Sequence, residues 1–307
     1  MANKTRCGFI AIVGAPNVGK STLVNQLVGT KVSIVSPKVQ TTRVRVLGIV
    51  VRDNSQLIFI DTPGIFKPRR RIDRAMVAAA WNGAADADRV VLLVDSAIGI
   101  DDDTGRIIEQ LKSHRTEAPK AEREKPILAL NKTDRVKKPK LLELASKLNE
   151  QGIFEETFMI SALNGEGVDD LADYLGRQAQ EGPWLYPEDQ ISDMPQRLLA
   201  AEITREKLYL QLRQELPYAA TVETEEWEER NDGSVSIRQV IFIERPSQKG
   251  IVLGKGGKRI KALGEASRLE LEEIFERRVH LFLFVKVRAK WGDDPERYRE
   301  WGLDFNA

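Results

Sequence analysis

The sequence contains a single cysteine, Cys7, among its 307 residues. One thiol cannot form a disulfide within the chain, which excludes a disulfide-stabilised fold and fits a reducing cytoplasm. Long apolar runs are also missing, because the longest are strand-sized, such as residues 90–94, whereas crossing a bilayer takes about 20 residues. The apolar run that follows residues 1–8 is too short for a signal peptide. We therefore expect a cytoplasmic chain with no membrane-spanning helix.

Neither sign of charge is in excess, since 47 Lys and Arg against 46 Asp and Glu leave a net charge of +1 (47 − 46). The apolar content of 42% and the charged content of 30% are typical of soluble globular proteins. We find no internal repeat and no low-complexity segment. A chain of this length is expected to form two domains, each with its own core.

Strand-like runs alternate with helical patterns over residues 5–180, which predicts an α/β domain with a mostly parallel sheet. Prolines at 183, 187 and 195 interrupt this alternation, and we interpret residues 181–196 as a linker. The aromatic residues in that stretch indicate that the linker packs against a domain. Residues 197–307 are expected to form a second domain.

Residues 14–21 match the phosphate-loop pattern G-x-x-x-x-G-K-[ST] and lie between a strand-like run and a helical one. Its glycines let backbone N–H groups turn toward phosphate oxygens, and the helix N-terminus favours an anion. Lys20 is predicted to contact the β- and γ-phosphates, and the Ser21 hydroxyl to bind Mg²⁺. A plain glycine-rich turn is the alternative, against which the strand–loop–helix context argues. The predicted phosphate-binding residues are Gly14, Ala15, Pro16, Asn17, Val18, Gly19, Lys20, Ser21, Thr22 and Gly64.

The base is predicted by the pattern N-K-x-D at residues 131–134. The Asp134 carboxylate can accept two hydrogen bonds from guanine, whereas adenine would leave this acceptor unpaired. Asn131 suits the other edge of the base, and the Lys132 stem can lie over the ring. A helix cap with a solvated lysine is the alternative, but the order after the phosphate loop favours guanine. After the next strand, backbone N–H groups are predicted to contact guanine O6 at Ser161, Ala162 and Leu163.

Two further segments complete a magnesium site. Asp61 begins the pattern D-T-P-G at a strand end and can hold the Mg²⁺ shell through water, while the Gly64 N–H can meet the γ-phosphate. Thr42 lies in a loop and can complete the coordination only while the γ-phosphate is present. The set resembles the GTPases of the Ras-like superfamily over roughly residues 5–180, which implies GTP and GDP as ligands and Mg²⁺ as cofactor. The predicted catalytic residues are Lys20, Thr42, Gly64 and Asn17.

One position departs from the Ras-like pattern. Ile65 replaces the glutamine that orients the attacking water, and isoleucine has no donor or acceptor, so slow and regulated hydrolysis is expected. GTPases with an apolar residue there and Asn at the position of Asn17 often bind K⁺ beside the phosphates, which offsets developing charge. Asn17 is therefore a candidate K⁺ ligand, and the alternative is that it only caps the loop. The basic run 69–71 is interpreted as a solvated face, with a contact to RNA phosphates as the alternative.

The second domain carries a G-x-x-G pattern at residues 254–257, at an expected strand-to-helix junction. In KH domains such a loop clamps a few nucleotides of single-stranded backbone. Residues 245–290 hold twelve Lys and Arg against five Asp and Glu, a net of +7 (12 − 5), and such a patch supports binding to phosphates. A glycine helix cap with solvated lysines is the alternative. The predicted RNA-binding residues are Lys249, Gly254, Lys255, Gly256, Gly257, Lys258, Arg259 and Lys261.

Hydrophobic periodicity predicts the remaining elements of this domain. A helix is expected over residues 197–212 and another over 258–275. Strands are expected over 221–227, 235–244 and 279–287.

The order of parts, a GTPase domain, a linker and a KH-like domain, resembles the bacterial Era family over nearly the whole chain. The segments that carry the resemblance are 7–9, 14–21, 40–43, 61–64, 131–134, 206–208, 215–218 and 254–257. The resemblance implies an α+β type II KH domain and a GTP-driven factor that binds the 3′ end of small-subunit ribosomal RNA and helps mature the small ribosomal subunit. It also implies a monomer with peripheral association to the inner membrane, for which no residue argues.

Two alternatives remain open. One is a membrane-associated signalling GTPase whose C-terminal domain binds protein or lipid. The other is an RNA-binding protein whose GTP site is structural.

Overall fold

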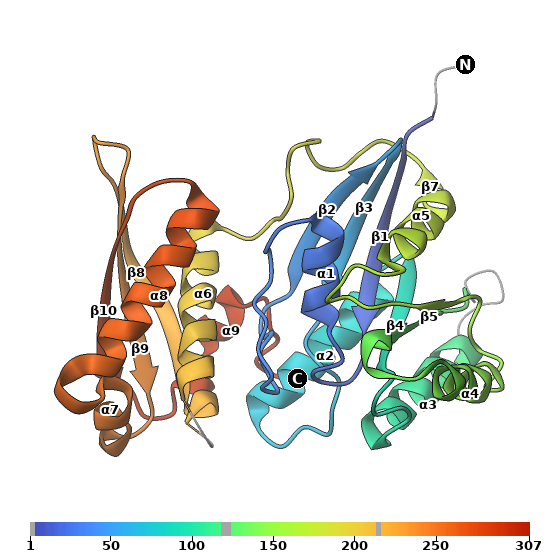
Figure 1. Cartoon of the computed structure of the whole chain (residues 1–307). Coiled ribbons are helices and arrows are strands. Elements are labelled where there is room, and N and C mark those ends of the chain that lie inside the picture. The colour runs from blue at the N-terminus through green and yellow to red at the C-terminus, as the bar shows by residue number, and fades with distance from the viewer. Residues whose placement is uncertain (1–3, 118–123, 213–215) are drawn as a thin grey trace. The chain divides into compact units, whose positions relative to one another are not determined.

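The computed structural model describes residues 4–117, 124–212 and 216–307, and their helices and strands are labelled in Figure 1. The chain forms two compact units that do not follow chain order. Unit 1 consists of Met1–Ser33, Thr42–Asp193 and Tyr298–Ala307, and unit 2 of Ile34–Thr41 and Met194–Arg297. Of the segments singled out in the sequence, 215–218 begins at Glu215, which lies outside the described residues.

The units depart from the predicted boundaries, 5–180 and 197–307, at both ends of the chain. Ile34 belongs to unit 2 because it packs into a buried cluster with Ala200 and Ile203. The last residues belong to unit 1 because the Arg71 guanidinium lies 4.3 Å from the centre of the Phe305 ring. The assignment of these two segments to unit 2 and unit 1 rests on contacts between residues far apart in the sequence. No local pattern predicts such contacts.

Unit 1 is built on a seven-stranded sheet. Its order is β2 (Val46–Arg52), β3 (Ser55–Asp61), β1 (Arg6–Val13), β4 (Arg89–Asp95), β5 (Ile127–Asn131) and β6 (Thr157–Met159), and β7 (Gln180–Glu181) pairs with β1. Among the strand pairs of this sheet that the structure describes, only β2–β3 and β1–β7 are antiparallel. The prediction of a mostly parallel sheet is therefore confirmed.

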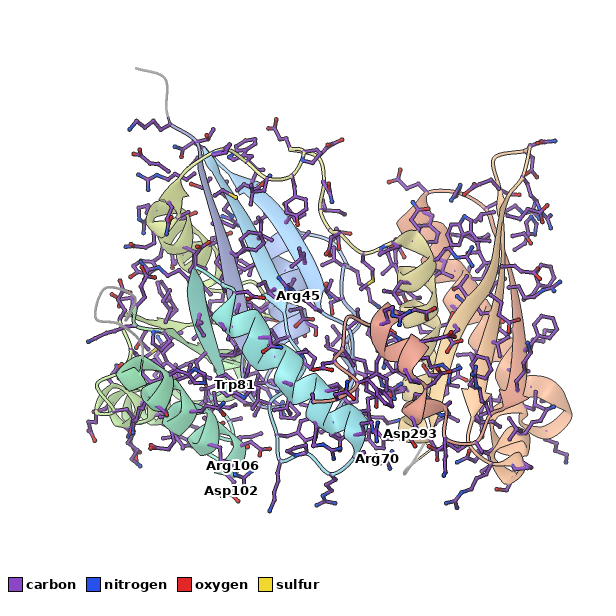
Figure 2. All side chains as sticks on the ribbon, turned by 180° about the vertical axis from the view of Figure 1, so that it is seen from behind. Arg45, Arg70, Trp81, Asp102, Arg106 and Asp293 are labelled. Atoms are coloured by element: carbon purple, nitrogen blue, oxygen red, sulfur yellow. The ribbon has the colours of Figure 1, made fainter. Side chains whose placement is uncertain are left out.

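Helices cover both faces of this sheet (Figures 1 and 2). On one face lie α1 (Lys20–Val28) and α5 (Val168–Gln178), and on the other lie α2 (Arg71–Ala85) and α3 (Asp102–Glu117). A further helix, α4 (Lys138–Asn149), follows β5. Figure 2 labels Arg70 at the start of α2 and Asp102 at the start of α3. Asp102 suits that place because acidic side chains stabilise the positive end of the helix dipole.

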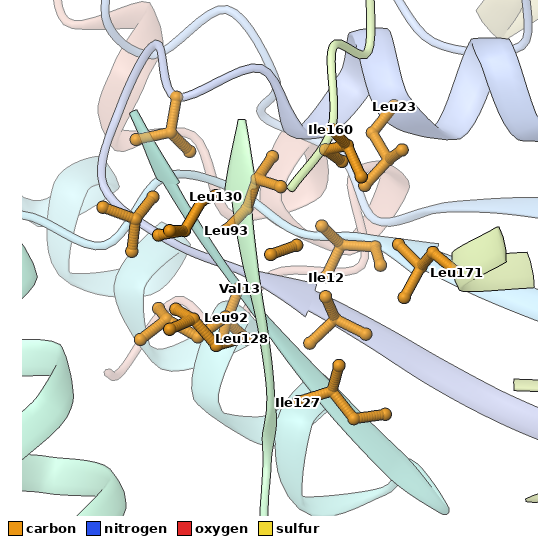
Figure 3. Packing of buried hydrophobic residues seen from close by; sticks show 14 of the residues in the cluster. Ile12, Val13, Leu23, Leu92, Leu93, Ile127, Leu128, Leu130, Ile160 and Leu171 are labelled. Atoms are coloured by element: carbon orange, nitrogen blue, oxygen red, sulfur yellow. The ribbon is translucent and has the colours of Figure 1, made fainter. Parts of the chain in front are cut away.

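The core of unit 1 is formed by the central parallel strands, as Figure 3 shows. Ile12, Leu93 and Leu128 come from three neighbouring strands, and each is 0% exposed. Strands buried on both faces are nearly continuous apolar runs, which is why the sequence pattern predicts them well. This packing fixes the strand ends that carry the motifs.

The predicted linker packs against the sheet of unit 1. The Gln56 side chain accepts hydrogen bonds from the backbone N–H groups of Leu185 and Tyr186, at 2.9 and 3.0 Å. The Ile49 N–H donates to the Ile191 carbonyl at 2.9 Å. Residues 185–191 are therefore held by paired backbone groups, as their aromatic content predicted.

Unit 2 is an α+β fold on a three-stranded sheet of order β10–β9–β8. Helices α6 (Gln196–Gln211) and α8 (Lys258–Phe275) cover one face of the strands β8 (Ala220–Glu229), β9 (Val235–Ile243) and β10 (Val279–Val287) (Figure 1). The β8–β9 pair is antiparallel and the β9–β10 pair parallel. A short helix, α9 (Pro295–Glu300), follows. The helices and strands predicted for this domain are confirmed.

One junction was predicted wrongly. Helix α7 (Pro246–Leu253) precedes the glycine turn, so the turn connects two helices and not a strand to a helix. The apolar residues before the turn resemble a strand, yet Val252 is fully buried on one helical face.

Within the described ranges, no helix has the length and apolarity that a bilayer crossing needs.

Candidate functional site

The nucleotide motifs meet at the carboxyl edge of the parallel sheet. Asp61 pairs with Ile12 at the end of β3, and Asn131 pairs with Asp95 at the end of β5. Because these strands are parallel, their carboxyl ends lie on one edge, which is where open α/β sheets bind ligands. The structure thus brings the predicted phosphate, magnesium and base motifs to the same edge.

The phosphate loop between β1 and α1 depends on two glycines. A Cβ at Gly14 would lie 2.5 Å from the Leu93 carbonyl oxygen, which is too close for any side chain. Gly19 has a φ of 104° and a Cβ there would lie 2.4 Å from the Asn131 amide nitrogen. Both positions therefore exclude a side chain, and the backbone N–H groups of the turn are available for an anion.

Lys20 is buried within this loop, being only 6% exposed. Its Nζ donates to the carbonyls of Gly14 and Ala15, at 3.1 and 2.9 Å. Burial lowers the pKa of Lys20 to about 8, while the nearby Asp61 carboxylate acts in the opposite direction. An incoming phosphate would supply the negative charge that this buried ammonium lacks.

The residues predicted to hold magnesium fit that ion. The hydroxyl oxygens of Ser21 and Thr42 are 2.9 Å apart. Two oxygens on adjacent positions of an octahedral Mg²⁺ shell, at 2.0–2.1 Å from the metal, lie about 2.9 Å apart as well. Asp61 is 0% exposed, and its Oδ1 has no hydrogen-bond partner in the described part of the chain. A buried carboxylate oxygen of this kind is suited to a metal-bound water.

Ser33 is a site residue that the sequence analysis missed. Its hydroxyl donates to Asp61 Oδ2 at 2.6 Å, which fixes the orientation of the carboxylate. Burial raises the pKa of Asp61, and the Ser33 hydrogen bond opposes that effect. No local pattern singles out this serine, because it lies in an irregular loop far from Asp61 in the sequence.

The side chain of Asn131 connects two loops by hydrogen bonds. Its Nδ2 donates to the Val18 carbonyl at 2.7 Å, and its Oδ1 accepts from the Ala162 N–H at 2.9 Å. Asp134 is exposed, and one of its oxygens accepts from the Ser161 hydroxyl at 2.7 Å. The structure therefore joins the phosphate loop, residues 131–134 and residues 161–163 into one assembly. Base reading by Asn131 and Asp134 stays a prediction.

The ammonium end of the Lys132 side chain is held by two contacts. Its Nζ donates to the Asn17 carbonyl at 2.7 Å and forms an ion pair with Asp95 at 2.6 Å. A stem fixed at its far end can lie over a base, as the sequence predicted. Asp95 was missed, although its place at the end of β4 is a recognisable signal.

Ile65, which stands where Ras-like GTPases have the glutamine, lies in apolar surroundings. Ile65 is 6% exposed and packs in the core, and its N–H donates to the Gly14 carbonyl at 3.1 Å. Gly64 lies against the phosphate loop, since a Cβ there would be 2.9 Å from the Pro16 Cα. Asn17 is exposed and adopts a φ of 62°, which asparagine tolerates. Ligation of K⁺ by Asn17 stays a prediction.

In unit 2, the glycine turn has the geometry of a backbone-binding loop. Gly254, Gly256 and Gly257 have φ values of 73°, 60° and 73°. Atoms added at Gly256 or Gly257 would meet nothing within 4 Å, whereas a Cβ at Gly254 would lie 2.7 Å from the Arg259 Cβ. The first glycine is therefore needed for packing, and the other two leave open space above the turn.

The lysines around this turn are exposed, and the structure describes no ion pair to any of them. They are Lys249, Lys255, Lys258 and Lys261. Arg259 differs, because its guanidinium donates to the Ile251 carbonyl and so caps α7. Four lysines therefore surround the turn as candidates for phosphate contacts, and Arg259 serves the local fold.

Comparisons with known sequences cover both units. A family model described as a 50S ribosome-binding GTPase matches residues 9–132, and a KH-domain model matches residues 215–292. The chain is 63% identical over 301 residues to GTPase Era of Sinorhizobium medicae (strain WSM419), covering 98% of this chain and 94% of that protein. It is 61% identical over 304 residues to GTPase Era of Brucella suis biovar 1 (strain 1330), covering 99% and 95%.

The chain also matches solved structures of Era proteins. The chain matches the crystal structure of Era in complex with MgGDPNP and nucleotides 1506–1542 of 16S ribosomal RNA, with a TM-score of 0.89 and 38% identity. A variant of Aquifex aeolicus Era bound to GDP and AlF4⁻ matches with the same TM-score and identity. Both matches cover 97% of this chain and 99% of the other, so they extend over both motif-bearing units.

Proposed function

The chain belongs to the Era family of GTPases and hydrolyses GTP to GDP and phosphate, and from this premise we propose that it binds the 3′ end of small-subunit ribosomal RNA and promotes maturation of the small subunit. The observation that carries the proposal is the open glycine turn of unit 2. Gly256 and Gly257 have left-handed backbones with open space above them, and exposed lysines surround them. The structurally similar Era protein binds nucleotides 1506–1542 of 16S ribosomal RNA.

Hydrolysis in this site rests on charge and position. Lys20 supplies a buried positive charge at the phosphate loop, which stabilises the charge on the transferring phosphoryl group. Ser21 and Thr42 would hold Mg²⁺, with Asp61 acting through water, and the ion would supply positive charge beside the β- and γ-phosphates. Gly64 allows the D-T-P-G segment to approach the phosphate loop closely, because no side chain would fit against Pro16.

The attacking water needs a partner other than residue 65. Ile65 is buried, its side chain has no donor or acceptor, and its N–H already donates to the Gly14 carbonyl. We propose that K⁺, held in part by the exposed Asn17 amide, supplies positive charge beside the phosphates. This explains how a site without the glutamine still hydrolyses GTP.

RNA binding by unit 2 depends on the shape of the glycine turn and on the positive charge around it. Backbone phosphates can approach the turn at Gly256 and Gly257 because no Cβ stands in their way. The surrounding lysines contribute a charge attraction that depends on salt, with a slope of about 0.7 per contact for single strands. Four such contacts predict a loss of roughly fiftyfold in affinity between 50 and 200 mM salt.

The experiment is a titration of the full chain with an oligonucleotide of the small-subunit rRNA 3′ end, followed by fluorescence anisotropy at both salt concentrations. We expect tight, salt-dependent binding in a monomeric cytoplasmic protein. Vesicles of anionic lipid should compete poorly with the RNA. Competition by vesicles with no RNA affinity would instead support the alternative, a membrane-associated signalling GTPase on the inner membrane.

A further inference from the structure

Helix α1 continues from the phosphate loop, and the chain that follows this helix stays in contact with it. The helix ends before Gly29, whose φ of 81° is a left-handed conformation that glycine adopts without strain. Val32 lies beyond this turn, is 3% exposed and belongs to the core cluster that also contains Val24 and Leu27 of α1. Apolar packing thus anchors the chain after α1 on one side.

On the polar side, the half-buried Asn25 amide pairs with the backbone of the same stretch. Its Oδ1 accepts from the N–H groups of Val32 and Ser33, both at 2.9 Å, and its Nδ2 donates to the Ser33 carbonyl at 2.7 Å. These partners define the orientation of the amide, because the reverse orientation would set its oxygen against a carbonyl. Asparagine suits this place because it offers a donor and an acceptor, whereas aspartate lacks the donor and leucine lacks both.

Ser33 connects this anchored stretch to the carboxylate at the end of β3. Ser33 is 2% exposed, and its hydroxyl donates to Asp61 Oδ2 at 2.6 Å. The other carboxylate oxygen, Asp61 Oδ1, is buried and has no hydrogen-bond partner among the residues that the structure describes. The serine therefore occupies one oxygen and leaves the other for a metal-bound water. A carboxylate held at one oxygen no longer rotates freely about its terminal bond.

Helix α1 contributes to the magnesium site at two points. Ser21 lies in its first turn and Asn25 one turn later, so both side chains project from the same side of the helix. Ser21, Asn25, Ser33 and Asp61 all belong to unit 1, so the arrangement is internal to one compact body. Anchoring of the loop alone needs only Val32 and the paired backbone groups. It gives no reason for the Ser33 hydroxyl to reach Asp61.

We propose that Asn25 is a positioning residue for the magnesium site, which acts through Ser33 to hold the Asp61 carboxylate in the orientation that a metal-bound water needs. The inference rests on the proposed function, because it takes Asp61 as one of the residues that would hold Mg²⁺ through water. Thr42 acts only with the γ-phosphate, whereas Asp61 lies at the end of a strand and acts with GDP as well. The role of Asn25 is therefore measurable without hydrolysis.

The test measures how Mg²⁺ slows the release of a fluorescent GDP analogue from the full chain. Ser33→Ala removes the hydroxyl, and Asn25→Ala removes the partner of three backbone groups. Each should raise the Mg²⁺ concentration needed for half-maximal slowing by about tenfold, the effect of one lost hydrogen bond to a charged group. Release in excess EDTA should stay within about twofold of the native rate, since no metal is then held. Damage to the phosphate loop would speed release in EDTA as well.

A double-mutant cycle shows whether Asn25 acts through Ser33. Because the proposed path to Asp61 passes through the Ser33 hydroxyl, adding Asn25→Ala to Ser33→Ala should change the Mg²⁺ dependence by less than about twofold. Gln26→Ala is the matched control, because Gln26 is the next residue of α1, also carries an amide and is exposed. It should release GDP at the native rate at every Mg²⁺ concentration.

Asn25→Asp keeps the test decisive if Asn25→Ala does not fold. It retains an acceptor for both N–H groups and loses the donor to the Ser33 carbonyl, so it should shift the Mg²⁺ dependence in the same direction by about threefold. Native Mg²⁺ dependence in the folded Asn25 variants would overturn the inference. An equally large effect in EDTA, or full additivity with Ser33→Ala, would also overturn it.

Asp61→Asn separates this inference from the proposed magnesium site. If Asp61→Asn loses the Mg²⁺ effect while the Asn25 variants keep it, the site stands and the positioning role is wrong. A native chain whose GDP release does not respond to Mg²⁺ would refute the site and the positioning role together.

Discussion

The hydroxyl oxygens of Ser21 and Thr42 lie 2.9 Å apart, although the residues are 21 positions apart in the sequence. One hydroxyl belongs to the first turn of α1 and the other to an irregular loop. Their spacing equals that of two adjacent ligands of Mg²⁺, which demands near-ideal octahedral geometry. Contacts within the chain therefore hold the two hydroxyl oxygens at the spacing that Mg²⁺ coordination needs.

Thr42→Ala is expected to impair hydrolysis more than it impairs GDP binding. Removing one oxygen ligand that acts with the γ-phosphate should lower the single-turnover rate by about a hundredfold. GDP affinity should change by less than about threefold, since that ligand is not needed for the diphosphate. Equal losses in both measurements would show that Thr42 serves the fold of the loop instead.

The affinity for GTP should depend on pH through Lys20. Burial lowers the pKa of Lys20 to about 8 from 10.5, and the phosphates bind its protonated form. Affinity should therefore be nearly constant below pH 7 and fall by about tenfold between pH 7 and pH 9. Without nucleotide the sign reverses, because the unfolded chain binds this proton more tightly, so the free energy of unfolding rises as pH increases above 8.

Isothermal titration with a GTP analogue at several pH values checks this expectation. Lys20→Arg is the control, since arginine stays protonated over the whole range and the titration of the nucleotide is common to both proteins. A fall in affinity with pH that is as steep in Lys20→Arg would assign the effect to the nucleotide.

Asp134→Asn should change the base preference from guanine toward xanthine. The amide presents a donor where xanthine offers a carbonyl, whereas guanine offers a donor. Competition between GTP and xanthosine triphosphate for the variant measures the change. Ser161→Ala should weaken GTP binding by only about tenfold, because it removes the hydroxyl that orients the carboxylate and leaves the carboxylate in place. Full GTP affinity in Asp134→Asn would refute base reading by Asp134.

Hydrolysis is expected to be faster in potassium than in sodium. The K⁺ ion would offset charge that no side chain at Ile65 can offset, and Asn17→Ala should abolish the difference between the two salts. Rates measured at equal ionic strength in KCl and NaCl decide this. Equal rates in the native protein would leave an RNA or protein group as the activator.

The sequence predicted the elements whose signals are local. The fully buried strands of unit 1, such as β4 and β5, read as apolar runs, and the nucleotide motifs stand at their ends. Helix α8 was predicted because Leu263, Ser267 and Leu271 share one buried face. Local patterns were sufficient in these cases, since each element carries its own burial pattern.

The remainder depends on contacts between distant residues. Helix α7 is short and contains Gly250, and the burial of Val252 in the core of unit 2 adds to the local support from Pro246 in its first turn. The contacts of Ser33 with Asp61 and of Glu206 with Val35 join residues 28 and 171 positions apart. No periodicity encodes such pairs, which is why the sequence located the magnesium site but not Ser33, which orients the Asp61 carboxylate.

The central claim is that this GTPase binds RNA through the turn at Gly254–Gly257. The most direct test is fluorescence anisotropy with a single-stranded oligonucleotide of the small-subunit rRNA 3′ end. It compares the native chain, a double variant with Lys255→Asp and Gly256→Asp, and a neutral control with Lys255→Gln and Gly256→Asn. Asparagine tolerates the left-handed backbone of residue 256, so the control separates charge from strain. We expect the double aspartate to lose RNA affinity by about a hundredfold or more and to show a shallower salt dependence, with GTP affinity and basal hydrolysis unchanged. RNA affinity that equals the native value in the double aspartate would contradict the account.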